Sequence, residues 1–120
     1  MITFNNEPKT NKFYIEKIDH ILKKTKNYGY AWSIHEDFPM NAFYAEDNIR
    51  GLKMIIIKLD SYSFYMIIKN MEGPDFLTIK SCSNISGSIK LHQKMNTLFK
   101  TIIHQIKDDA YDNIITKMEA

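Results

Sequence analysis

Two neighbouring apolar runs, Leu52–Leu59 and Phe64–Lys69, constrain the fold of this chain more than any other part of it. Their isoleucine and aromatic content, with the polar pair Asp60-Ser61 between them, predicts two strands joined as a β-hairpin. Successive side chains of a strand point to opposite faces of a sheet, and here both alternate sets are largely apolar. Because a face in contact with water is normally polar, we expect a cover on each face of the hairpin.

Further strand patterns flank the hairpin. Residues Tyr28–Ile34 alternate aromatic or aliphatic side chains with small ones, and Phe76–Ser83 also alternates. The stretch 41–49 fits either a capped helical turn or a strand, and the strand is preferred. Loops that contain Pro39 and Gly73-Pro74 separate these segments.

Amphipathic helices are predicted at the two ends of the chain. The first begins between residues 7 and 11, repeats its apolar residues every 3.6 positions, and ends at Asn27–Gly29. The second is expected over Ser88–Lys107, with its first residue as N-cap. Beyond it the apolar positions shift by roughly a third of a turn, which predicts a break and a separate helix Asp109–Glu119.

This order of elements predicts a single α+β domain that spans residues 1–120. An antiparallel sheet of about four strands, arranged as a meander, lies between an N-terminal helix and two C-terminal helices. The two long helices are expected to cover one face of the sheet. The other face needs Asp109–Glu119, the segment 38–44 or a second subunit as its cover.

Composition is that of an ordinary globular protein of 120 residues. Valine is absent and all but one of the basic residues are lysine, which indicates AT-rich coding such as that of a low-GC bacterium or its phage. One cysteine excludes an internal disulfide, no signal-peptide pattern is visible, and no apolar run is long enough to cross a bilayer. We therefore expect a cytoplasmic protein with no membrane partner.

No motif for catalysis or metal binding is present in the sequence. His35-Glu36-Asp37 and Glu46-Asp47 bunch possible ligands, but adjacent residues rarely converge on one ion. His92 and His104 stand more than three helical turns apart and are expected at the surface. Cys82 has no recognisable base beside it. The sequence therefore favours a non-catalytic protein without cofactor or metal.

Two alternative functions come from the last third of the chain. Nucleic-acid binding by a lysine face is the second hypothesis, although a net charge of +2 is small for that role. An enzyme or phosphate-ligand binder at the turn 86–90 is the third, because a helix N-terminus attracts anions. The anion-binding residues of this turn are Ser86, Gly87 and Ser88. The lysine face comprises Lys80, Lys90, Lys94, Lys100 and Lys107, in a stretch without an acidic residue.

Aromatic residues gather between residues 27 and 49, where the chain has four acids and, up to Ile49, no lysine or arginine. Tyr and Trp beside carboxylates form credible protein-binding surfaces, although the same residues also fill cores. The leading hypothesis is a small accessory or inhibitory protein that binds a protein partner without catalysis. A homodimer that buries the second sheet face is also expected. The predicted interaction residues are Tyr28, Tyr30, Trp32, Glu36, Asp37, Phe38, Phe43 and Tyr44.

Overall fold

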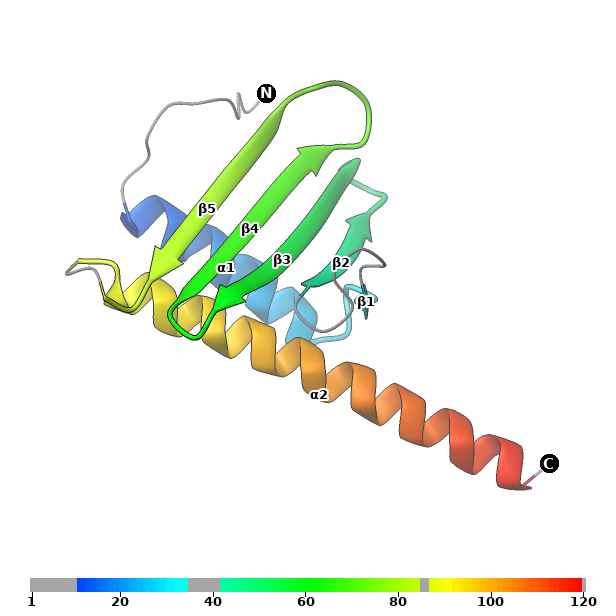
Figure 1. Cartoon of the computed structure of the whole chain (residues 1–120). Helices are drawn as coiled ribbons and strands as arrows, with labels where there is room; N and C mark the ends of the chain where they lie inside the picture. Colours follow the sequence, from blue (N-terminus) through cyan, green and yellow to red (C-terminus); the bar gives the residue numbers. More distant parts are fainter. Residues whose placement is uncertain (1–10, 35–41, 85–86, 120) are drawn as a thin grey trace.

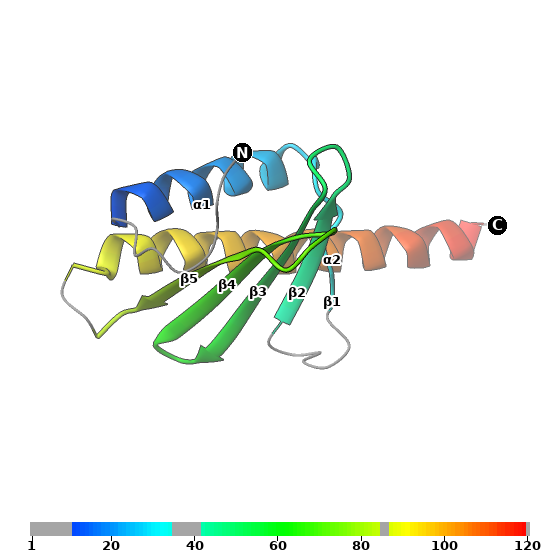
Figure 2. The ribbon, with the colours of Figure 1, turned by 90° about the horizontal axis from the view of Figure 1, so that it is seen from above.

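Two helices lie side by side over one face of a β-sheet in a computed structural model of the chain (Figure 1, Figure 2). The structure describes residues 11–34, 42–84 and 87–119. Within these residues the sheet has five strands in the order β1-β2-β3-β4-β5, and each neighbouring pair is antiparallel. The predicted α+β class and meander are therefore confirmed. The elements are α1 (Asn11–Lys26), β1 (Ser33–Ile34), β2 (Ala42–Asp47), β3 (Leu52–Asp60), β4 (Ser63–Asn70), β5 (Phe76–Cys82) and α2 (Ile89–Glu119).

The predicted hairpin forms the centre of the sheet as β3 and β4. Ile56 pairs with Met66 on the face toward the helices, and Ile55 pairs with Ile67 on the opposite face. Large apolar side chains directly opposite each other stabilise adjacent strands. A slip of one residue would exchange the two faces, so the burial of one face specifies this register.

The hydrophobic core lies between the helices and the sheet. Ile18 of α1 and Leu98 and Ile102 of α2 are completely buried there, as the predicted helical stripes require. Burial of side chains of this size stabilises the folded state by about 1.5–3 kcal/mol each. The strands contribute Phe43, Ala45, Met54, Ile56, Phe64, Met66, Ile68, Leu77 and Ile79 to this core.

The C-terminal part of the fold differs from the prediction, since α2 runs without interruption over all 31 of its residues. The predicted break before Asp109 is therefore wrong. An exposed Asp inside a helix costs less than about 0.7 kcal/mol relative to alanine, whereas ending and restarting a helix leaves further backbone groups without intrahelical partners. The shift in apolar positions that suggested the break instead turns the last apolar residues of α2 away from the sheet.

The first two strands also differ from the prediction in extent. Only Ser33 and Ile34 of the stretch 28–34 pair with β2, and Tyr28 has a left-handed φ of 58° in the turn after α1. The ambiguous stretch 41–49 contains β2, which pairs along its whole length with β3. The sheet therefore has five strands rather than about four, because pairing with an apolar neighbour selects the strand over the helical turn.

We predict that the amides of β3 and β4 exchange with solvent more slowly than those of the other strands. Both are hydrogen-bonded on two sides along most of their length, whereas within the described residues β2 has its second partner only at Phe43 and Tyr44, so exchange in β3 and β4 requires opening of the core rather than local fraying. Hydrogen–deuterium exchange followed by NMR checks this. The amides of Glu72, Gly73 and Asp75, in the turn after β4, serve as the internal control, and equal rates in the two sets would refute the assignment.

Candidate functional site

Three residues of the predicted aromatic interaction surface belong to the core instead. Tyr30, Trp32 and Phe43 are each less than a tenth exposed. The Trp32 Nε1–H donates to Thr25 Oγ1 of α1 at 3.0 Å, and its ring packs edge-to-face against Tyr30. Side chains buried in this way offer little area to a partner, so they join α1 to the sheet.

The remaining residues of that surface divide into two groups. Tyr28 is 73 % exposed in the turn after α1. Tyr44 is half-buried on β2, opposite Ile55, and points away from the helices. Only these two of the described members are accessible to a protein partner. Three predicted residues lie outside the described residues: Glu36, Asp37 and Phe38.

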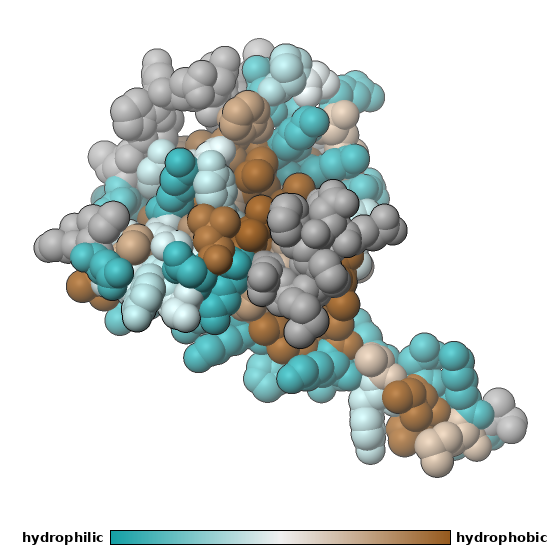
Figure 3. All heavy atoms as spheres, viewed as in Figure 1, coloured by the Kyte–Doolittle hydropathy of each residue, from teal (hydrophilic) through white to brown (hydrophobic). Residues whose placement is uncertain are grey.

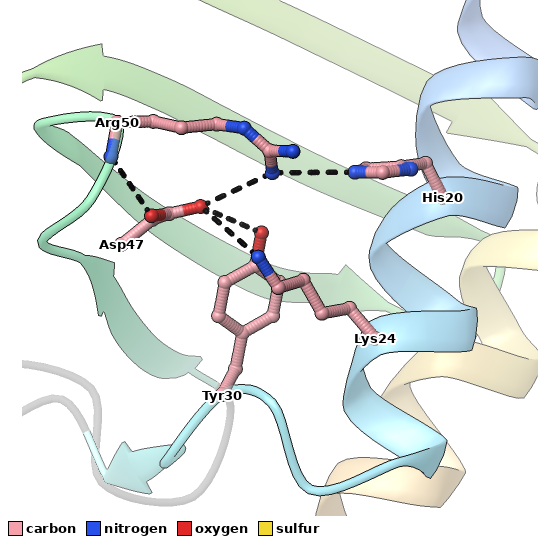
Figure 4. A network of polar contacts seen from close by, with 5 residues as sticks. All are labelled: His20, Lys24, Tyr30, Asp47 and Arg50. Carbon is pink, nitrogen blue, oxygen red and sulfur yellow. Dashed lines mark hydrogen bonds and ion pairs between the residues drawn. The ribbon is translucent and has the colours of Figure 1, made fainter.

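A buried carboxylate at the end of β2 gathers several polar partners (Figure 4). Asp47 Oδ2 accepts a hydrogen bond from the Tyr30 hydroxyl at 3.0 Å and lies 3.8 Å from Lys24 Nζ. Arg50 meets both carboxylate oxygens: its backbone N–H donates to Oδ1 at 3.0 Å, and its Nη1 lies 3.4 Å from Oδ2. The same Nη1 lies 3.3 Å from His20 Nε2. Asp47 thus ties the turn 48–51 to α1 and to the segment that follows it.

The pKa values of Asp47 and Tyr30 determine which of the two donates the hydrogen bond between them. Burial acts to raise the pKa of Asp47, but the hydrogen bonds from Arg50 and Tyr30 and the charges of Lys24 and Arg50 outweigh it and hold that pKa below the ordinary 3.8. Burial and the bond to Asp47 raise the pKa of Tyr30 to about 12. At neutral pH Asp47 is therefore ionised, and Tyr30 remains its donor.

A pocket of about 210 Å³ adjoins this network, between α1 and the adjacent ends of β3, β4 and β5. Its interior is apolar, and Met54 and Leu77 in its floor are buried. Its rim carries the basic side chains of Lys17, His20 and Arg50, and none of the described residues that line it is acidic. The pocket therefore combines an apolar interior with a cationic rim.

The lysines of the predicted nucleic-acid face lie on different sides of the molecule. Lys80 lies on β5 with its Nζ 5.0 Å from the centre of the Tyr65 ring, on the sheet face that points away from the helices. Lys94 forms a 3.0 Å ion pair with Asp19 of α1. Nucleic-acid binding stays a prediction, and its lysines do not follow one continuous line. The members that remain exposed on α2 are Lys90, Lys100 and Lys107.

The predicted anion site before α2 takes part in contacts within the fold. Ser88 Oγ accepts a hydrogen bond from the Cys82 backbone N–H at 3.3 Å, and the Gly87 carbonyl accepts one from a side-chain amide of α1. The Ser88 carbonyl accepts the His92 N–H at 2.9 Å, as expected for an N-cap residue. Ser86 lies outside the described residues. Phosphate binding at this turn stays a prediction.

His92 is half-buried rather than at the surface. Its Nδ1 lies 3.2 Å from Ser81 Oγ, and its ring centre lies 5.2 Å from that of Phe64. Burial, followed by the charge of Lys58, lowers the pKa of His92. Ser81 is only 4 % exposed, so a substrate has little access to its hydroxyl. The pair therefore contributes to packing rather than to nucleophilic catalysis.

Apolar side chains remain accessible on the face of the sheet that points away from the helices, which we call the open sheet face (Figure 3). Ile55 pairs with Ile67 and Ile57 with Tyr65 across its centre, and all four are half-buried. Both helices lie on the other side of the sheet, so neither covers this face (Figure 2). The patch is bordered by Lys53, Lys69 and Lys80.

The last turns of α2, Lys107–Glu119, extend past the edge of the sheet (Figure 1). We call this segment the projecting end. Its apolar side chains are largely exposed: Tyr111 by 66 %, Ile114 by 57 % and Met118 by 76 %. The projecting end therefore does not cover the second sheet face, which removes one of the three covers considered from the sequence.

The sequence indicated neither the Asp47 network nor the pocket. Their residues come from α1, the segment after it, the turn 48–51 and four strands, and no local pattern joins these segments. One signal was present: Arg50 is the single arginine of the chain. Arg50 departs from the lysine-rich composition, but a single arginine does not by itself predict a site.

Within the part of the chain that the structure describes, no three His, Cys, Asp or Glu side chains gather as a metal site requires. The bunched His35, Glu36 and Asp37 lie outside that part. Among the same described residues, neither helix is both long and apolar enough to cross a membrane.

We predict that Asp47→Asn lowers the free energy of unfolding by about 2 kcal/mol at neutral pH, because it removes charge-assisted bonds to a buried group. The pKa of Asp47 is lower in the folded than in the unfolded state, so its contribution is complete above the ordinary 3.8 and is lost as the pH falls through the folded value. Urea unfolding at pH 7 and pH 3 measures both effects. The exposed Glu16→Gln on α1 is the control, and equal losses in the two variants would contradict the prediction.

Comparisons of the chain with protein-family models, curated proteins and solved structures found no match. The function therefore has to be inferred from the surfaces of this molecule itself: the projecting end, the open sheet face and the pocket.

Proposed function

We propose that this protein is a small non-catalytic interaction protein, an accessory or inhibitory factor, that binds a protein partner through the projecting end of α2. The supporting observation is an amphipathic helix segment that the core does not use. Tyr111, Ile114 and Met118 are each more than half exposed. Large apolar side chains on one face of a helix normally pack against a neighbour, and an exposed group of them marks an interaction site.

The energetics of the projecting end also support a partner. Helices of this length are marginal in water, and most helix stability in proteins comes from packing of the apolar face. Residues 107–119 are exposed with the exception of half-buried Ile115, so they receive little of that stabilisation from the rest of the chain. A partner that packs on the apolar stripe supplies it.

The arrangement of charges defines the partner surface that fits. At roughly 100° per residue, Met118 lies at the centre of the apolar stripe and three acidic residues lie along one of its edges. The complementary surface is an apolar groove with lysine or arginine along one side, in which the helix lies lengthwise. The acidic residues of this edge are Asp108, Asp112 and Glu119, whereas Asp109 lies on the opposite side of the helix from Met118.

A second copy of the chain is the proposed occupant of the open sheet face. Its centre is apolar, with Ile55, Ile57 and Ile67 half-buried. A two-fold dimer requires a self-complementary surface, so charges of both signs are favourable at the rim. Glu46 lies directly opposite Lys53 on this face and provides the negative charge beside the positive ones.

We predict that Ile114→Asp weakens partner capture about tenfold or more, because a charge buried without a partner costs well over 1.4 kcal/mol. The control is Thr116→Asp, which adds the same charge about 160° away around the helix from Met118. Affinity capture from a lysate of the source cells compares the proteins retained by each bait. The proposal requires a protein retained by the wild type and the control but lost with Ile114→Asp, and identical captures would contradict it.

We further predict a mass close to twice the 14.1 kDa of the chain in analytical ultracentrifugation at micromolar concentration. Ile67→Glu on the open sheet face is expected to give a monomer, because it introduces a charge into the apolar contact. The matched control is Gln93→Glu, at an exposed position of α2. Thermal unfolding verifies that both variants are folded. A wild-type monomer at high micromolar concentration would rule out the dimer.

A further inference from the structure

We propose that the pocket beside the Asp47 network binds a small amphipathic carboxylate, with its apolar body inside and its carboxylate at Arg50. This inference goes beyond protein binding and does not depend on it. The pocket lies on the helix side of the sheet, away from the open sheet face, and its lining includes no residue of the projecting end.

The interior of the pocket determines the body of the ligand. Ile21 of α1 and Met54, Ile68 and Leu77 of the strands provide apolar walls. Each of these side chains is less than a tenth exposed, so the walls are held in position by the core. The volume of about 210 Å³ is below the roughly 300 Å³ at which most ligand pockets begin. A short alkyl chain or a single ring therefore fits better than a long lipid.

The rim determines the charge of the ligand. Lys17 lies at the rim with its Nζ 5.0 Å from the centre of the Phe13 ring, and His20 and Arg50 lie beside it. Asp47 contacts Arg50, but it is buried and its oxygens already accept hydrogen bonds from Tyr30 and Arg50. A second acid, Glu72, lines a separate hollow that Arg50 also borders. Lys17, Lys24 and Arg50 carry three positive charges against the two carboxylates of Asp47 and Glu72. A monoanion balances this positive excess.

The type of cation supports a carboxylate in particular. A guanidinium has five N–H donors in a planar fork that matches a carboxylate, whereas an ammonium is a point charge. The contacts of Arg50 with Asp47 and His20 both use Nη1, so they occupy only part of this donor set. In a chain whose other basic residues are lysine, the single arginine stands at the rim of an apolar pocket.

Three probes with the same alkyl chain and different head groups test the proposal: octanoate, 1-octanol and octylammonium. They are titrated into the full chain, and binding is followed by calorimetry and by NMR of the backbone amides. Octanoate is expected to bind saturably, with its largest shifts at Ile21, Met54 and Leu77. Octanol is expected to bind about tenfold more weakly, because charge-assisted hydrogen bonds are roughly twice as strong as neutral ones. Octylammonium is expected not to bind.

Variants at the rim separate recognition of the carboxylate from general apolar binding. Arg50→Gln is expected to weaken octanoate binding about tenfold and to leave octanol unchanged, while Arg50→Lys falls between it and the wild type. Lys17→Gln, which does not touch Asp47, is expected to give a smaller loss of the same kind. Lys23→Gln, at an exposed position of α1 that does not line the pocket, is the control and is expected to bind like the wild type.

The test compares the affinities of the probes for each variant, and it applies only to variants that are folded. Thermal unfolding verifies each variant, and Lys17→Gln provides the test if Arg50→Gln is unstable. Absence of saturable octanoate binding would overturn the proposal. Equal affinities for octanoate and octanol, or octanoate binding that neither Arg50→Gln nor Lys17→Gln weakens, would show an apolar cavity without carboxylate recognition and would also overturn it.

Discussion

A central hairpin with two apolar faces imposes the condition that the rest of this structure has to meet. Hydrophobic stabilisation grows with the apolar area removed from water, so each face gains by being covered. α1 and α2 both cover the same face, where Met54, Ile56 and Met66 are buried. Ile55 and Ile67 on the opposite face remain half-buried. The two faces of the sheet are therefore covered unequally. The apolar area that stays at the surface of the open sheet face is available for binding a second molecule.

The position of α1 depends on polar contacts as well as on packing. Asp47 receives hydrogen bonds from Tyr30 and Arg50 and lies near the charge of Lys24, so a single carboxylate joins α1, the segment after it and the turn between β2 and β3 (Figure 4). Removal of one member would leave a buried charge without its partners. The Arg50 side chain that stabilises Asp47 also stands at the rim of the pocket. The same contacts therefore support the fold and shape the proposed ligand site.

The projecting end shows how a helix can exceed the surface that it packs on. Backbone hydrogen bonds continue from residue to residue whether or not a sheet lies beneath, and the exposed Asp108 and Asp109 reduce helix stability only slightly. The apolar stripe of the last turns lies about a third of a turn from the core stripe, so even a wider sheet would not bury it. A segment of this kind adds little to the core and presents a binding surface.

Local pattern and tertiary structure determined different parts of this protein. The periodicity of apolar residues was enough to predict the central hairpin, both long helices, β5 and the meander, because alternation and helical stripes are properties of neighbouring residues. The strand at 41–49 needed its pairing with β3, and the continuity of α2 past Lys107 needed a comparison of backbone energies that a pattern of side chains does not contain.

The candidate sites depended on tertiary structure to a greater degree. The aromatic residues of the stretch 27–49 were visible in the sequence, but only packing decided that Tyr30 and Trp32 are core residues while Tyr28 is exposed. The pocket and the Asp47 network join segments that are far apart in the chain, and no pattern of neighbouring residues predicted them. Arg50, which lines the pocket, was visible in the sequence only as the single arginine. Sequence patterns record which faces are apolar, whereas the meeting of particular polar atoms is decided by how helices and sheet pack in three dimensions.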